Sequence, residues 1–198
     1  MIRKSIYNKE GEGFSVSDPG SLEKLYDKYA PGFLSLCFRY CGNIEDAEDV
    51  LHDGFIKIIN KVETFQERDT GSFAGWMNKI MVNTALNFLR DHAKQKRFID
   101  IDPIHDRINF QEEAETQFEE LTSKINQEQV MEMICELPSG YRTVFNLFVF
   151  ESYSHREIAQ ELNISENTSK SQLSKARAML KKRINESLIT KEDSHGKE

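Results

Sequence analysis

The sequence of 198 residues contains no apolar run long enough to cross a bilayer, and its polar beginning lacks the apolar core of a signal peptide. We therefore expect a cytoplasmic protein. Cysteine is scarce, and the three residues lie inside helical patterns, which indicates reduced and mostly buried thiols instead of a disulfide framework. Cys37 and Cys41 share one helix face, but no nearby histidine pair completes a metal site, so we expect no metal and no cofactor.

Strand signals are also nearly absent, because no alternating apolar runs are bounded by tight turns. Apolar residues instead recur at spacings of three and four in two blocks. We predict an all-α fold of two small helical domains joined by a flexible acidic linker, with a helix-turn-helix in the C-terminal domain. The expected parts are a flexible arm at 1–20, a domain at 21–92, the linker at 93–125, a second domain at 126–187 and a tail at 188–198.

The net charge of −7 argues at first against a nucleic-acid partner, but the charges are unevenly distributed. Residues 79–97 carry five basic side chains against one acidic, and residues 166–183 carry six against one. Residues 45–53 carry five carboxylates with no lysine or arginine, and residues 100–120 carry eight against one arginine. Since local fields decide what a surface attracts, we predict two DNA-binding surfaces, one protein-binding surface and a solvated linker.

The first block predicts three helices. The first begins at Ser21 and ends near Tyr40, and Pro31 can kink or split it. Asn43 can cap the second helix, and Ser72 can cap a third that ends near residue 90.

Carboxylates crowd the beginning of the second helix. Glu45 and Asp46 suit the positive end of the helix dipole, but this effect fades after the first turn and does not explain Asp49 and Asp53. A solvated face is one interpretation, and a docking face for a basic partner is the other.

The third helix has one apolar face, and the opposite face carries a tryptophan, two amides and two cations: Trp76, Lys79, Asn83, Asn87 and Arg90. Such a stripe can stack on, hydrogen-bond to and neutralise a single nucleic-acid strand. Phe65 and Phe73 flank the preceding loop, so we expect more aromatic surface nearby. Core burial of Trp76 and a merely solvated stripe are the alternatives.

The sharpest signal lies in residues 154–180. Ser154 and Glu157 have the spacing of a capping box. Asn163 tolerates the left-handed backbone of a tight turn, and Ser165 can cap the helix that follows. Two short helices joined in this way form a helix-turn-helix, whose second helix can enter the major groove. An ordinary helical hairpin with a solvated basic face is the alternative.

A helical wheel at about 100° per residue divides this second helix into two sides. The core side holds Ser169, Leu173, Ala176 and Leu180, and the outer side holds Asn167, Ser171, Ser174 and Ala178, flanked by Lys170 and Lys175. Small polar residues beside lysines suit a groove about 12 Å wide. Arg177, Lys181, Lys182 and Arg183 are better placed to contact phosphates.

Four segments, in this order, resemble the extracytoplasmic-function (ECF) group of bacterial RNA polymerase sigma factors, within the primary sigma family. They are residues 22–40 (LEKLYDKYAPGFLSLCFRY), 44–65 (IEDAEDVLHDGFIKIINKVETF), 73–90 (FAGWMNKIMVNTALNFLR) and 137–180 (LPSGYRTVFNLFVFESYSHREIAQELNISENTSKSQLSKARAML). The first three are similar to the first helix, the polymerase-binding helix and the promoter-melting helix of sigma region 2, and the fourth to region 4.

The resemblance implies roles for individual residues. Asp46, Asp49, Asp53 and Phe55 would dock on the beta-prime clamp of core RNA polymerase. Asn83 would hold a base flipped from the minus-ten element, with Trp76, Lys79, Asn87 and Arg90 on the same surface and residues 66–72 closing over the base. The minus-thirty-five element would be contacted by Asn167, Lys170, Ser171, Ser174, Lys175 and Arg177. A contact with the beta flap and an anti-sigma factor as partner are also implied.

Some residues depart from the family pattern. His52, Ile59 and Ser169 stand where glutamine, tryptophan and valine are usual. Lysines replace the commoner arginines on the recognition helix, which weakens bidentate readout of guanine. The departures leave the promoter sequence open.

The sequence contains no catalytic constellation, because its histidines are scattered and no glycine-rich phosphate loop is present. We therefore expect a binding protein without enzyme activity or a small-molecule substrate. Two rivals are a stand-alone helix-turn-helix regulator and an enzyme or scaffold whose basic stripes are incidental.

Overall fold

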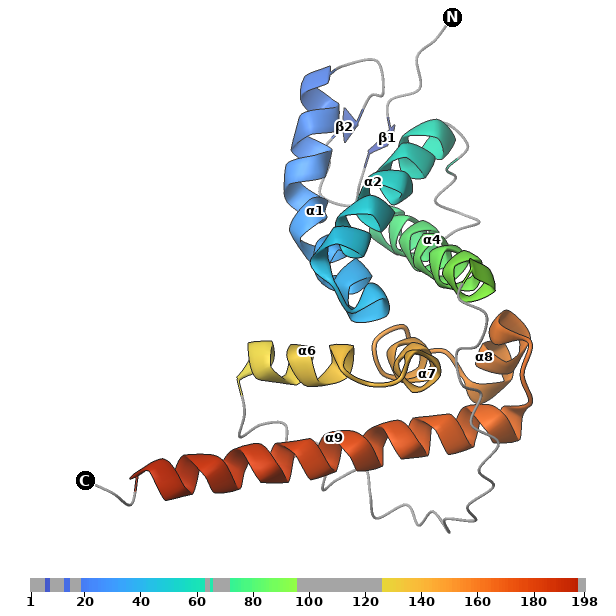
Figure 1. Cartoon of the computed structure of the whole chain (residues 1–198). Helices are drawn as coiled ribbons and strands as arrows, with labels where there is room; N and C mark the ends of the chain where they lie inside the picture. The colour runs from blue at the N-terminus through green and yellow to red at the C-terminus, as the bar shows by residue number, and fades with distance from the viewer. Residues whose placement is uncertain are drawn as a thin grey trace, which may run out of the picture. The chain divides into compact units, whose positions relative to one another are not determined.

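The computed structural model describes residues 6–7, 13–14, 19–62, 65, 72–95 and 126–195. The chain divides into two compact units, Met1–Arg97 (unit 1) and Phe98–Glu198 (unit 2). Helices dominate both units, which confirms the predicted all-α class (Figure 1).

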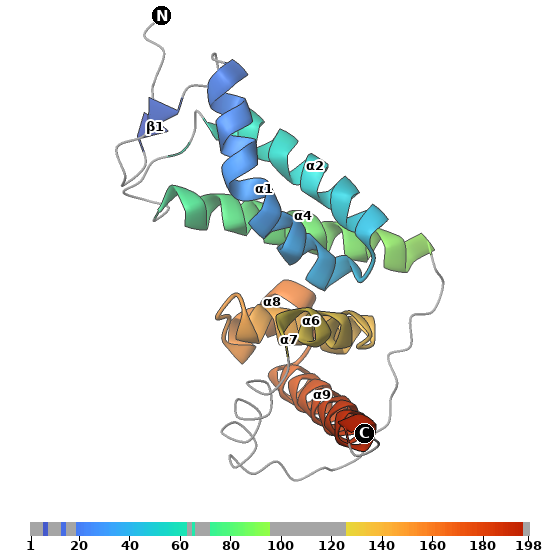
Figure 2. The ribbon, with the colours of Figure 1, turned by 90° about the vertical axis from the view of Figure 1, so that its left-hand side faces the viewer.

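The described residues of unit 1 contain three helices that all contact one another: α1 (Pro19–Cys41), α2 (Ile44–Lys61) and α4 (Phe73–Gln95) (Figure 2). The predicted alternative of a split at Pro31 is wrong, since α1 continues through the exposed proline; a kink stays a prediction. An internal proline removes one helix hydrogen bond. Burial of the neighbouring Ala30 and Phe33 against the other helices offsets this loss.

The arm before α1 is not wholly irregular. Strands β1 (Ile6–Tyr7) and β2 (Gly13–Phe14) pair antiparallel, and α1 begins two residues earlier than predicted. Two residues per strand are too few to produce an alternating pattern, so these strands could not be predicted from periodicity.

Helix caps in unit 1 follow the prediction. The backbone N–H of Asp46 donates to Asn43 Oδ1 over 2.8 Å, and the N–H of Gly75 donates to Ser72 Oγ over 3.1 Å. Helices α2 and α4 approach closely at Gly54, where a Cβ would lie 2.3 Å from Met81 Sδ. The glycine therefore sets the distance between the helix of carboxylates and the helix of the polar stripe.

In its described residues, unit 2 contains α6 (Gln127–Cys135), α7 (Ser139–Val149), α8 (His155–Leu162) and α9 (Glu166–His195). Helices α6, α7 and α8 all contact α9, and α8 lies at its N-terminal end (Figure 1). The core between them is formed mainly by Ile134, Leu137, Val144, Phe145, Leu147, Ile158, Leu173, Ala176, Leu180 and Ile184.

Two helices end later than predicted. Helix α4 continues five residues past Arg90, and α9 reaches His195 although a frayed tail was expected from residue 185. Neither extension contains glycine or proline, the residues that most disfavour a helix. The helix can therefore continue beyond its apolar stripe. The remainder of the predicted linker, residues 96–125, lies outside the described residues.

Neither a membrane span nor a metal site is found in the ranges that the structure describes. Cys37 and Cys41 are buried thiols. Burial raises the pKa of Cys37 to about 12, so this thiol stays protonated near neutral pH.

Candidate nucleic-acid interface

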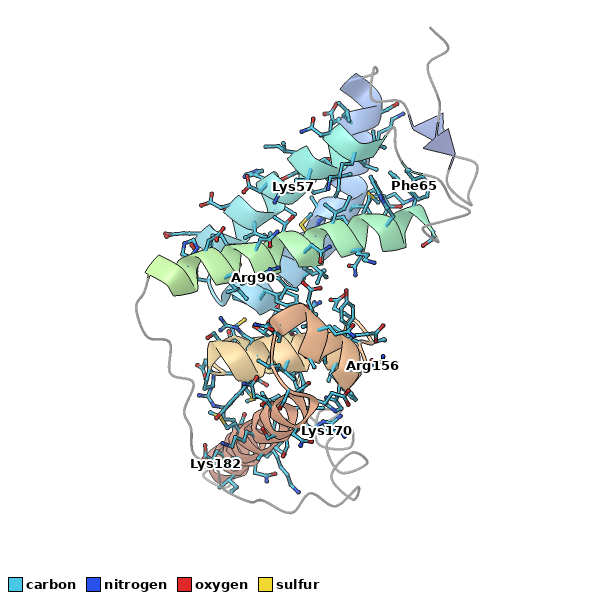
Figure 3. The ribbon with its side chains drawn as sticks, turned by 90° about the vertical axis from the view of Figure 1, so that its right-hand side faces the viewer. Lys57, Phe65, Arg90, Arg156, Lys170 and Lys182 are labelled. Carbon is cyan, nitrogen blue, oxygen red and sulfur yellow. The ribbon has the colours of Figure 1, made fainter. Side chains whose placement is uncertain are left out.

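The polar stripe of α4 lies on the surface of unit 1. Lys79, Asn87 and Arg90 are exposed, and Trp76 and Asn83 are half-buried. The opposite side of the helix is held in the core by buried side chains, among them Met77, Met81, Val82 and Ala85, as the helical periodicity predicted. Figure 3 labels Arg90 on this helix. The fold therefore brings the five predicted residues to one helix whose apolar side fixes its orientation.

Trp76 is part of an aromatic cluster at the start of α4. Its ring lies 5.3 Å from that of Phe65 and stacks on Phe73 at 5.6 Å with an angle of 19° between the planes. The prediction of further aromatic surface from these two phenylalanines is wrong, because both are buried. They instead support Trp76, which keeps a partly accessible ring. Of the loop predicted to close over a base, all but Ser72 lies outside the described residues.

The acidic face of α2 is mostly solvent-exposed. Asp49 and Asp53 are exposed, whereas Asp46 is half-buried and accepts a hydrogen bond from Asn43 Nδ2 over 2.7 Å. Phe55, the fourth residue predicted to contact polymerase, is buried. Its ring packs 4.7 Å from that of Tyr26 and 5.9 Å from that of Phe33. Phe55 faces α1 because it lies on the same side of the helix as the other core residues.

The helix-turn-helix of unit 2 has the predicted local chemistry. The backbone N–H of Ser154 donates to Glu157 Oε2 over 2.8 Å, and Ser154 Oγ accepts from the N–H of Glu157 over 3.3 Å, which completes the capping box. Asn163 ends α8 in the left-handed conformation, with φ 54° and ψ 45°. Ser165 Oγ accepts from the N–H of Thr168 over 2.9 Å and so caps α9.

The first turns of α9 separate a buried side from an exposed side. Ser169, Leu173, Ala176 and Leu180 are buried as predicted. Asn167, Lys170 and Ser171 are exposed, and Figure 3 labels Lys170 on the near end of the helix. Lys175 is half-buried, and its Nζ lies 5.9 Å from the ring centroid of Tyr141 on α7. The ring holds this lysine beside the exposed face through a cation–π contact.

The predicted outward position of Ser174 is wrong, because the residue is buried at 7% exposure. Its hydroxyl has no hydrogen-bond partner among the described residues. A serine side chain is short, and Lys170 and Arg177, one turn before and after it on the helix surface, are much larger. Ser174 therefore offers little surface to a base in this conformation.

The cations predicted to contact phosphates already have protein partners. The guanidinium of Arg177 lies 5.6 Å from the ring centroid of Phe148. Arg183 forms a salt bridge with Glu136, and Lys182 Nζ lies 3.9 Å from Glu186 Oε1. These contacts hold Arg177 and Arg183 towards the rest of unit 2. Of the three cations in the first turns of α9, Lys170 is exposed, whereas Lys175 and Arg177 are half-buried.

The sequence does not identify His155 as a residue that joins the two helices of the motif. His155 Nδ1 lies 2.9 Å from Ser169 Oγ, so the first helix of the motif is joined to the second by a polar contact. The two residues are 14 positions apart and on different helices, and no periodicity connects them. The sequence contained one signal for this contact, the serine at position 169 where the family usually has valine. A buried hydroxyl needs a hydrogen-bond partner, and His155 is that partner.

Known proteins match both units. The family model described as Sigma-70 region 2 matches residues 25–95, and that described as Sigma-70, region 4 matches residues 127–180. RNA polymerase sigma factor SigV of Bacillus subtilis is 31% identical over 161 residues, which cover 81% of this chain and 86% of that protein. ECF RNA polymerase sigma factor SigW of the same organism is 27% identical over 197 residues, covering 93% and 97%. The ECF RNA polymerase sigma-E factor of Haemophilus influenzae is 27% identical over 178 residues, covering 87% and 92%.

Proposed function

Because the chain belongs to the ECF family of RNA polymerase sigma factors, which direct transcription initiation, we propose that its two units bind promoter DNA in two different forms. Unit 1 captures unpaired bases of the minus-ten element, and unit 2 binds the intact duplex of the minus-thirty-five element. The functional domains are residues 21–92 and 126–187. The observation that carries this proposal is that each family region contains one helix with a buried apolar side and an exposed polar, cationic side.

In unit 2, the exposed beginning of α9 enters the major groove. Asn167, Lys170 and Ser171 face the base edges, and Lys175 lies beside them against Tyr141. A groove about 12 Å wide admits a helix whose outer side chains are short or flexible. Ser174 is excluded from this set by its burial, and Arg177 supports the fold of the motif more than it contacts phosphate.

In unit 1, the stripe on α4 binds an unstacked base. The amide of Asn83 can both donate and accept hydrogen bonds, and the Trp76 ring offers a stacking surface supported by buried phenylalanines. Lys79 and Arg90 offset the charge of the strand. Extruding a base costs a few kcal/mol, which these contacts must supply.

The acidic face of α2 docks on a basic surface of core RNA polymerase, for which we propose the beta-prime clamp. Asp49 and Asp53 are exposed carboxylates beyond the first helical turn, where dipole compensation no longer explains them. We further expect a contact of unit 2 with the beta flap, an anti-sigma factor as regulator, and a cytoplasmic location, where polymerase and the genome are found.

A gel shift on duplex promoter DNA tests this assignment against a stand-alone helix-turn-helix regulator. With core polymerase present, we expect a specific complex that is lost on Lys170→Ala. Without core polymerase, binding should be weak, because separate weak sites gain affinity when they act in one assembly. Tight specific binding by the isolated chain, unchanged by core polymerase, would favour the stand-alone regulator.

A further inference from the structure

The ring of His155 is held between three helices of unit 2. His155 is the first residue of α8, and its imidazole stacks on Phe148 of α7 with centroids 4.7 Å apart and an angle of 25°. Its Nδ1 meets Ser169 Oγ of α9 at 2.9 Å. Ser169 is fully buried, whereas His155 is half-buried. The imidazole therefore has a fixed orientation at the point where α8 and α9 meet.

Ser169 is a suitable partner for both charge states of the ring. A serine hydroxyl can donate to a neutral Nδ1 and accept from a protonated one, so protonation of the ring does not break this hydrogen bond. Among the described residues, Nε2 has no hydrogen-bond partner, and it is not one of the buried polar atoms. Nε2 is thus the ring nitrogen that an outside acceptor can reach.

The free protein disfavours the charged form of the ring. Partial burial, followed by the nearby charges of Lys170 and Arg177, lowers the pKa of the imidazole below its usual value of 6.5. Glu166 acts in the opposite direction and is outweighed. Phe148 on α7 carries no charge, and the beginning of α8 presents the positive end of its dipole. An approaching anion would reverse this balance by favouring the imidazolium.

We propose that His155 donates from Nε2 to a backbone phosphate of duplex DNA and binds one proton from solvent as the DNA docks. The inference rests on the proposed function of unit 2. The first helix of a helix-turn-helix crosses the DNA backbone, and α8 is that helix. Arg156 and Lys170 are exposed at the same end of the unit and attract the same backbone (Figure 3). Ser169 acts as a positioning residue that orients the ring.

Proton uptake makes duplex binding depend on pH. Between the lower pKa of the free protein and the higher pKa of the complex, binding takes up a proton, so affinity falls as pH rises, by at most about tenfold per pH unit. Below both pKa values and above both, this group no longer makes the affinity depend on pH. Lower pH therefore strengthens the interaction with the minus-thirty-five duplex.

The test measures the affinity of the holoenzyme for the duplex upstream half of a promoter that this holoenzyme has been shown to transcribe. From about pH 5.5 to about pH 7.5, we expect the wild-type affinity to fall about threefold to tenfold more than that of His155→Gln. His92→Gln is the matched control, because His92 lies in unit 1 with its ring 3.9 Å from that of Phe88. This variant should keep the wild-type pH profile.

The salt dependence of duplex binding distinguishes a charged contact between His155 and a phosphate from an effect of His155 on packing. At about pH 5.5, the slope of log affinity against log salt should be steeper in wild type than in His155→Gln by about 0.9, the value for one additional phosphate contact. At about pH 7.5, the two slopes should agree. Ser169→Ala should reduce the pH dependence while leaving the salt slope at the higher pH unchanged.

Parallel pH profiles and equal salt slopes for wild type and His155→Gln would overturn the proposal, provided that both bind the promoter specifically. Absence of specific binding at every pH would instead contradict the proposed function of unit 2. The two failures are therefore distinguishable in one data set.

Discussion

Helices α4 and α9 both present polar faces, but the two faces are built differently. On α4 the face consists of two amides, a partly buried tryptophan and two cations, and its support comes from aromatic side chains behind it. On α9 two of the cations are held by aromatic rings, Lys175 beside Tyr141 and Arg177 on Phe148, and Lys170 is exposed. The first face offers hydrogen bonds and a stacking surface, whereas the second offers positioned charge.

This difference matches the two forms of DNA. An unpaired base exposes its ring and its hydrogen-bonding edge, so stacking and amide groups bind it. A duplex hides its rings and presents phosphates around a groove, so positioned cations are more useful. Under the proposed function, the neighbours of each helix would therefore set which form of DNA it binds.

The largest expected effect concerns how tightly each helix is packed. Gly54→Val should destabilise unit 1 by about 2 kcal/mol, because the new side chain would overlap Met81 in the core. The matched change in unit 2 is Gly140→Val, where a Cβ would lie no closer than 3.6 Å to Gln172. This change should alter stability by less than about 0.5 kcal/mol. Thermal unfolding of both variants checks the contrast, and Met81→Ala should partly rescue Gly54→Val. Equal losses at the two glycines would contradict it.

Asn83→Ala tests the face of α4. We expect promoter opening to slow by about tenfold, equivalent to about 1.4 kcal/mol, because a base loses its amide partner. Duplex contact should be spared. The measurement is transcription from a closed promoter and from the same promoter with a pre-melted minus-ten element. The pre-melted template should restore Asn83→Ala, and failure to do so would show that the residue has another role.

Lys170→Ala tests the face of α9, and Ser174→Ala is its control. Loss of the exposed lysine should weaken specific duplex binding, because it removes a donor that we place at the base edges. Ser174→Ala should leave binding unchanged, because this serine is buried. The substitution also removes a hydroxyl that has no hydrogen-bond partner among the described residues. Binding titrations at several salt concentrations measure both. A loss on Ser174→Ala equal to that on Lys170→Ala would restore the original prediction for Ser174.

The smallest expected effect concerns the start of the helix-turn-helix. Ser154→Ala should cost about 1 kcal/mol of stability by removing the cap of α8. The hydrogen bonds from Ser154 lower the pKa of Glu157 below its usual value of 4.5. Their contribution is therefore present above the unfolded pKa and is lost as pH falls through the folded pKa. Unfolding at neutral pH and near pH 3 should show a smaller difference between wild type and Ser154→Ala at the acidic pH; an equal difference would exclude the coupling to Glu157.

The features that the sequence predicts well are local ones. Asn43, Ser72, Ser154 and Ser165 cap their helices as expected, because each acts on a backbone group within three residues. The apolar stripes of α4 and α9 are likewise buried, since the helical period alone decides which residues share a face.

The features that the sequence misses depend on neighbours from other elements. A helical wheel gives the direction of Ser174 but not the size of the side chains around it, and it does not show which ring Phe55 meets on α1. The contact between His155 and Ser169 requires the angle between α8 and α9, which no sequence period contains. The DNA and polymerase roles of individual residues stay predictions.

In vitro transcription with purified core RNA polymerase on genomic fragments tests the central claim most directly. With this protein added, we expect RNA synthesis from new start sites, and the combined Asn83→Ala and Lys170→Ala variant should lose those transcripts while still binding core enzyme through α2. If the chain neither associates with core polymerase nor creates new start sites, the assignment of its two units to two forms of promoter DNA is contradicted.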